Sequence, residues 1–93
     1  MPRYLIERTL FEGMVLPGPS QGLQARQEFL ANNALAGVTW VFSYVAPDHR
    51  RSFCIYDAPT PEALRQAAQR NGLPVDRITE VCMLDPYCSV PKS

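Results

Sequence analysis

The chain has 93 residues, 46% of them hydrophobic, with nine basic and nine acidic side chains and a formal net charge of zero. This length predicts a single domain over residues 1–93, and the balanced charge excludes the broad basic field that attracts nucleic acid or an anionic membrane surface. No apolar run is long enough to span a bilayer, the first residues predict no secretory signal, and the three cysteines show no CxxC spacing. We therefore expect a cytoplasmic protein with reduced thiols.

The first part of the chain predicts a strand, a loop and a helix. Residues Arg3–Leu10 are rich in β-forming side chains, and Glu12–Gly22 is rich in glycine and proline. Apolar residues then recur at helical spacing over Leu23–Ala36, and Gly37 suits the helix end. Asn33 projects toward the expected contact between helix and sheet. The helix has two adjoining apolar stripes, formed by Leu23, Leu30 and Ala34 and by Ala25, Phe29 and Ala36.

Two further strands are predicted at Val38–Val45 and Ser52–Asp57, joined by a polar turn at 47–50. Both strands carry bulky side chains on both faces. A sheet with one solvated face instead alternates between apolar and polar residues. Something must therefore cover the second face of this sheet.

The last third of the chain predicts a helix and a strand. Thr60 is a favourable N-cap, Pro61 suits the first helical position, and Gly72 suits the helix end. Residues Arg77–Leu84 predict the final strand. With right-handed crossovers, the order βαββαβ predicts a ferredoxin-like α+β fold, in which a four-stranded antiparallel sheet in the order 4-1-3-2 carries both helices on one face.

Side-chain alternation divides the sheet residues between two faces. Because helices usually pack on aliphatic and β-branched residues, we assign the helix-covered face to Ile6, Val41, Val45, Phe53, Ile55 and Val81. The open face then receives Leu5, Glu7, Trp40, Phe42, Tyr44, Cys54, Tyr56, Glu80 and Cys82. An aromatic patch of this kind is uncommon on a stable monomer, so we expect a second copy of the sheet to cover it in a homodimer, as in a dimeric α+β barrel.

The open face is also the candidate ligand site. Glu7 and Glu80 are expected on neighbouring strands, and carboxylates in an apolar setting are costly unless they are paired, share a proton or bind a cation. Tyrosine hydroxyls could donate hydrogen bonds there, and Cys54 offers a soft ligand. The predicted ligand-binding residues are Glu7, Trp40, Tyr44, Cys54, Tyr56 and Glu80. The alternatives are pairing of the glutamates with Arg8, Arg51 or Arg77, a small buried hydrophobe at Cys54, and a face that serves dimer packing alone.

Several segments of the chain resemble a known family. They are YLIER at Tyr4–Arg8, VTWVFSYV at Val38–Val45, FCIYDAPTPEALR at Phe53–Arg65, and GLPVDRITEV at Gly72–Val81 followed by Asp-Pro. Their order and spacing resemble a family of small bacterial proteins of unknown function, one member of which is described as a cytoplasmic nickel-binding protein with a dimeric ferredoxin-like fold. The resemblance implies the same fold, a dimer, and nickel or another divalent metal as the candidate cofactor.

The resemblance fails at one place that matters for nickel. Members of the family often read R-E-H-A in the second helix, where this chain has Arg65, Gln66, Ala67 and Ala68, so the acid and the imidazole are missing. The only histidine is His49, in the predicted turn between two strands. A lone turn histidine is more often solvated than a metal ligand, because a metal needs several convergent donors. The candidate metal ligands are therefore Glu7 and Glu80, together with His49 or with thiols from a second chain.

No complete catalytic motif is present, and the catalytic residues of any reaction are unknown. The chain lacks a phosphate-binding glycine loop, a convincing Ser–His–acid set and zinc-type cysteine spacing. We expect a non-enzymatic binding protein for a metal ion or a small polar ligand. One alternative is a cofactor-free monooxygenase or isomerase of the dimeric α+β barrel type, with a cavity between sheet and helices and Tyr44, Tyr56, Glu7 or His49 as acid or base. A structural interaction module is the other alternative.

Overall fold

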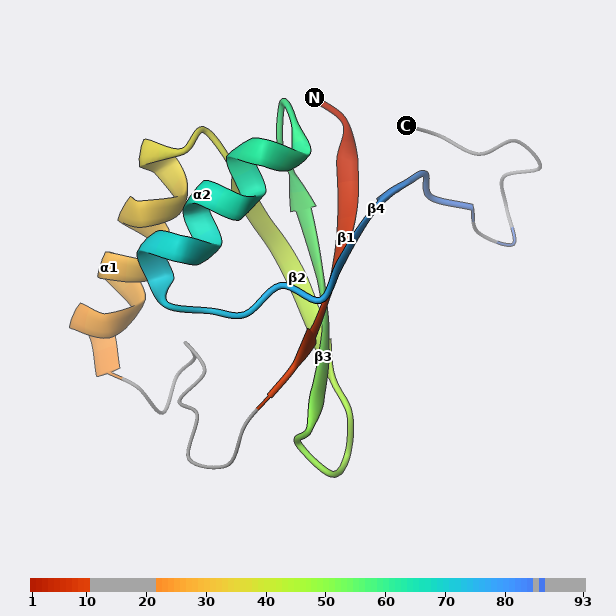
Figure 1. The fold of residues 1–93 in the computed structure, drawn as a ribbon, viewed down its shortest axis with the longest axis horizontal. Coiled ribbons are helices and arrows are strands. Elements are labelled where there is room, and N and C mark those ends of the chain that lie inside the picture. Colours follow the sequence, from red (N-terminus) through yellow and green to blue (C-terminus); the bar gives the residue numbers. More distant parts are fainter. Residues whose placement is uncertain (11–21, 85, 87–93) are drawn as a thin grey trace.

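The structure of the chain, a computed structural model, describes residues 1–10, 22–84 and 86, with the side chains of 22–26 left out. The predicted loop at Glu12–Gly22 lies outside the described residues except for its last position. The elements are β1 (Arg3–Thr9), α1 (Gly22–Leu35), β2 (Thr39–Val45), β3 (Arg51–Asp57), α2 (Pro61–Asn71) and β4 (Arg77–Val81). The sheet is antiparallel, with strand order β2-β3-β1-β4, and both helices lie on one side of it (Figure 1). The predicted ferredoxin-like fold and strand order are therefore confirmed.

Helix α2 begins and ends at the residues that the sequence predicts. The side-chain hydroxyl of Thr60 accepts a hydrogen bond of 3.1 Å from the backbone N–H of Ala63. At the other end Gly72 adopts φ 67°, a left-handed conformation that glycine tolerates without a steric penalty. The buried face of α2 is narrow and small, since it consists of Ala63, Leu64, Ala67 and Ala68. Because these helix side chains are small, large side chains of the sheet can pack beneath the helix.

Helix α1 packs through one of its two predicted stripes, the one that contains Phe29, and through Asn33, which was expected at the contact. Phe29 and Asn33 are buried, whereas Leu30 is 46% exposed and Ala34 is also exposed. Asn33 lies at the contact with α2, where the side-chain amide of Asn71 donates a hydrogen bond of 3.2 Å to the Asn33 carbonyl oxygen. The prediction of the apolar stripe at Leu30 and Ala34 was wrong because a hydrogen-bonded polar residue occupies the centre of this contact.

Pairing with β1 determines which side chains of β3 face the helices. Tyr4, Ile6 and Arg8 alternate along β1 as its buried residues. Tyr4 pairs with Tyr56 and Ile6 pairs with Cys54, so these residues of β3 also lie beneath the helices. The prediction that Cys54 and Tyr56 belong to the open face was wrong. The same register places Phe53, Ile55 and Val81 on the open face, although they were assigned to the helix side. It places Glu80 on the helix side, in register with Tyr4, although Glu80 was assigned to the open face.

An irregularity in β2 divides its aromatic residues between the two faces. Trp40 pairs with Tyr56, but Phe42 pairs with Ile55, so Val41 is an extra residue in β2. Such a bulge interrupts the regular alternation of side chains. Trp40 therefore lies on the helix side, where its ring meets Phe29 edge-on at a centroid distance of 5.4 Å. Its assignment to the open face was wrong, whereas Phe42 and Tyr44 lie there as expected.

The open face of the sheet combines apolar side chains with cross-strand ion pairs. Phe42 is 44% and Tyr44 68% exposed, and their rings lie 5.3 Å apart. Two hydrogen bonds, of 2.8 and 3.0 Å, join the Arg3 guanidinium to Asp57 and hold the pKa of that carboxyl below its usual value. We define the open-face patch as Leu5, Phe42, Tyr44, Phe53, Ile55 and Val81.

Neither described helix is long and apolar enough to cross a membrane.

Candidate functional site

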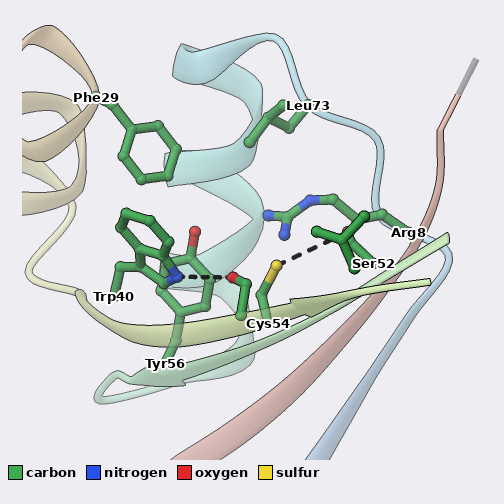
Figure 2. A pocket seen from close by; sticks show the side chains of 9 residues that line it. Arg8, Phe29, Trp40, Ser52, Cys54, Tyr56 and Leu73 are labelled. Atoms are coloured by element: carbon green, nitrogen blue, oxygen red, sulfur yellow. Dashed lines mark hydrogen bonds between the residues drawn. The ribbon is translucent and has the colours of Figure 1, made fainter. Parts of the chain in front are cut away.

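A cavity of about 200 Å³ lies on the helix-facing side of the sheet (Figure 2). It is bounded by Phe29 of α1, by side chains of β1, β2 and β3, and by Leu73, which follows α2. From the predicted ligand-binding set, Trp40, Cys54 and Tyr56 line the cavity, whereas the other members do not. The complete lining is Arg8, Phe29, Trp40, Ser43, Val45, Ser52, Cys54, Tyr56 and Leu73.

Arg8 is a buried cation at the edge of this cavity. Its residue is only 3% exposed, and its Nε has no hydrogen-bond partner among the residues that the structure describes. Figure 2 shows the guanidinium end pointing into the space below Phe29 and Leu73. None of the ion pairs within the described part of the chain includes Arg8. Because a guanidinium stays protonated, the cavity contains a positive charge without a matching carboxylate among its described neighbours.

Tyr56 presents a neutral hydroxyl to the same cavity. The residue is 2% exposed, and burial raises the pKa of its phenol from 10.0 to about 12. The positive charge of Arg8 and a hydrogen bond from it act in the opposite direction, and Cys54 raises the pKa further. The carbon centre of the guanidinium lies 5.8 Å from the centroid of the Tyr56 ring. The phenol is therefore protonated at neutral pH and can donate a hydrogen bond.

Two serines complete the polar side of the cavity. The indole N–H of Trp40 donates a hydrogen bond of 2.8 Å to Ser43 Oγ, and the Cys54 thiol lies 3.8 Å from Ser52 Oγ (Figure 2). Each serine oxygen accepts in these contacts, so each hydroxyl keeps its own hydrogen for a further bond. The polar lining therefore consists mainly of hydrogen-bond donors, and the remaining wall is apolar.

The predicted metal ligands lie in three separate places. Glu7 is on the open face, where its carboxylate accepts a hydrogen bond of 3.2 Å from Arg51. Glu80 is an exposed residue of β4 on the opposite face, in register with Tyr4. His49 lies in the turn between β2 and β3 with φ 59°. Across residues 1–10, 22–84 and 86, no group of three or more His, Cys, Asp or Glu side chains is placed to hold a metal ion.

Pairing with an arginine was one alternative for the two glutamates, and it applies to Glu7, whose carboxylate pairs with Arg51.

Sequence reasoning did not place Arg8 in the site, although one signal was available. Arg8 follows Tyr4 and Ile6 at the two-residue spacing of a strand, so it shares their face. The remaining lining residues that were missed are Phe29, Ser43, Val45, Ser52 and Leu73, which tertiary packing brings together.

The fold and the cavity define a ferredoxin-like α+β domain with an internal pocket between its two layers. Residues 4–81 match the family described as nickel responsive protein SCO4226-like, and the chain belongs to this family. The earlier resemblance to a family of small bacterial proteins is thereby confirmed.

Among solved structures, the crystal structure of SCO4226 from Streptomyces coelicolor A3(2) is similar, with a TM-score of 0.67. The two sequences are 24% identical over 89% of this chain and 99% of that chain, and this likeness concerns the fold. No curated protein matches the chain.

Proposed function

We propose that this protein is a homodimeric, non-enzymatic binding protein for a small ligand, and that the cavity beneath the helices is its binding site. The observation that carries the proposal is the buried Arg8, whose Nε has no hydrogen-bond partner in the described part of the chain and whose side chain points into a cavity of about 200 Å³. An apolar pocket with a few convergent polar groups is the usual form of a small-molecule site.

The chemistry of the lining favours binding over catalysis. A monooxygenase or isomerase of the dimeric α+β barrel type would also have its cavity between sheet and helices. However, the described lining contains no histidine or carboxylate that could act as a general base, and Tyr56 keeps its proton until about pH 12. Glu7, Tyr44 and His49, the other candidate acids and bases, do not line the cavity.

The open-face patch supports a homodimer in which a second sheet covers the first. Its aromatic residues are substantially exposed, and an apolar surface of this kind usually marks a contact with another molecule. Cys54 and Cys82 are free thiols, which supports a reducing compartment such as the cytoplasm.

The binding proposal can be tested by NMR with a set of small fragments of neutral, cationic and anionic character. Trp40 is the single tryptophan and lines the cavity, so its indole N–H signal reports directly on occupancy. At least one class of fragment should shift this signal together with the amide signals of Arg8 and Leu73. A protein whose Trp40 signal stays unchanged with every fragment at millimolar concentration would instead be a structural module.

The family description makes nickel a second candidate ligand. The described residues do not fit it: the predicted donors are dispersed, and the charge of Arg8 disfavours a cation in the cavity. A nickel site would therefore need donors from two chains, with Glu80 as one of them. Calorimetry with nickel and zinc should give the same heat for the parent, for Glu80→Ala and for the matched control Glu62→Ala, which removes an exposed carboxylate of α2. A loss of nickel binding in Glu80→Ala alone would support the metal site instead.

A further inference from the structure

We infer that the cavity selects a small organic monocarboxylate with an apolar body, and that Arg8 is the residue that recognises its charge. This inference rests on the proposed function, because it names the class of ligand for the same site. It depends on three features of the cavity. They are a positive charge without a carboxylate partner among the described residues, the kind of donors beside that charge, and the apolar remainder of the lining.

The first feature is the contrast between buried Arg8 and the three arginines that form ion pairs in the described part of the chain. Arg3, Arg51 and Arg65 each have a carboxylate partner, at 2.8, 3.2 and 3.5 Å. These side chains are partly exposed, so water could also have satisfied them. Arg8 is 3% exposed and is in no ion pair among the described residues. A buried charge is costly unless it is paired, so an anion in the cavity would remove this cost.

The second feature is the geometry of the donors. The Nε–H and an adjacent Nη–H of a guanidinium form a planar edge with two donors, which a carboxylate accepts with both oxygens. The Nε of Arg8 has no described partner. Neutral hydroxyls of Ser52 and Tyr56 lie beside it in the lining and can donate to the remaining lone pairs. With one cation in the described lining, one negative charge is matched, whereas a dianion would carry a charge in excess.

The third feature is the apolar part of the cavity. Phe29, Trp40, Val45 and Leu73 are the larger apolar side chains of its lining. A dry protein cavity of about 150 Å³ accommodates benzene. The volume here, about 200 Å³, therefore suits one ring or a branched alkyl group together with a carboxylate. Inorganic anions would leave this wall without contacts.

Phenylacetate is a suitable probe because it joins one ring to one carboxylate. Binding to the full chain is measured by Trp40 fluorescence and by calorimetry, with phenylacetamide as the neutral analogue of equal size and acetate as the anion without the ring. Phenylacetate should bind at least about tenfold more tightly than either, as expected for a charge-assisted hydrogen bond and for a filled apolar wall. Equal affinities for phenylacetate and phenylacetamide would overturn the inference. Equal affinities for phenylacetate and acetate would show that the cavity does not select a ligand with an apolar body.

Arg8→Met tests the residue itself, since methionine keeps an unbranched side chain and removes the charge. This variant should lose about tenfold or more in affinity for phenylacetate and should bind phenylacetamide as the parent does. Arg51→Met, which removes an arginine from the open face, is the matched control and should behave as the parent. Arg8→Lys keeps the charge without the two-donor edge and should lose part of the affinity. Retained preference for the acid in Arg8→Met would assign recognition to another group.

Folding of Arg8→Met can be verified independently of binding. The removed charge is buried and has no ion-pair partner within the described residues, so the melting temperature of Arg8→Met without ligand should equal or exceed that of the parent. The two proposals also fail in different ways. If neutral fragments shift the Trp40 signal but phenylacetate shows no advantage, the cavity is a binding site and the monocarboxylate inference is wrong. If no compound shifts the signal, the binding function is wrong as well.

Discussion

Alkaline titration of Tyr56 should destabilise the folded protein. Burial raises the pKa of this phenol from 10.0 to about 12, while the unfolded chain exposes it to water. Between these values the unfolded state has released the proton and the folded state still holds it, so the free energy of unfolding falls as the pH rises. At about 1.36 kcal/mol per pKa unit, the loss attributable to Tyr56 approaches about 3 kcal/mol above the higher value, and it is absent below the lower value.

Urea unfolding followed by far-ultraviolet circular dichroism measures this effect at pH values from about 8 to about 12. Tyr56→Phe removes the titrating group but keeps the ring, so the parent should lose about 2 kcal/mol more than this variant over that range. Tyr44→Phe is the matched control, since Tyr44 is 68% exposed, and it should follow the parent. If the parent and Tyr56→Phe lose stability in parallel, the hydroxyl of Tyr56 is not buried and the described cavity is wrong.

Further substitutions test the core, a helix cap and the open face. Leu64→Ala should cost about 2–5 kcal/mol in urea unfolding because Leu64 is 1% exposed, whereas Leu35→Ala, at a residue that is 69% exposed, should cost less than about 0.5 kcal/mol. Thr60→Ala removes the acceptor for the Ala63 N–H and should cost about 1 kcal/mol, with Thr60→Ser retaining most of the stability. Phe42→Glu should convert the proposed dimer to a monomer in light scattering with unchanged circular dichroism. A parent protein that is already monomeric at micromolar concentration would contradict the dimer.

The local elements and their order could be predicted because their signals lie close together in the sequence. Thr60, Pro61 and Gly72 mark the ends of α2 by backbone chemistry that depends on neighbours only a few residues away. The order of these elements, with right-handed crossovers, restricts the topology to one sheet arrangement. The ferredoxin-like fold therefore followed from the residues before any tertiary contact was known.

The faces of the sheet could not be predicted in the same way, because alternation fixes only relative positions within one strand. The preference for aliphatic residues beneath helices failed at β3, where pairing with Tyr4 and Ile6 places Tyr56 and Cys54 beneath the helices. The small alanines of α2 are compatible with such large residues. The face assignment of β3 thus depends on its partner strand and on the helix above it.

What the sequence determined was the set of elements, their ends and the fold, because these depend on short-range periodicity and capping. What only the tertiary structure decided was the cavity between sheet and helices. One extra residue, Val41, separates Trp40 from Phe42 and Tyr44, and β1 carries Arg8 beneath the helices beside Tyr56. Strand register and a bulge arise from contacts between segments far apart in the chain, and a shift of one residue moves every following side chain to the other face.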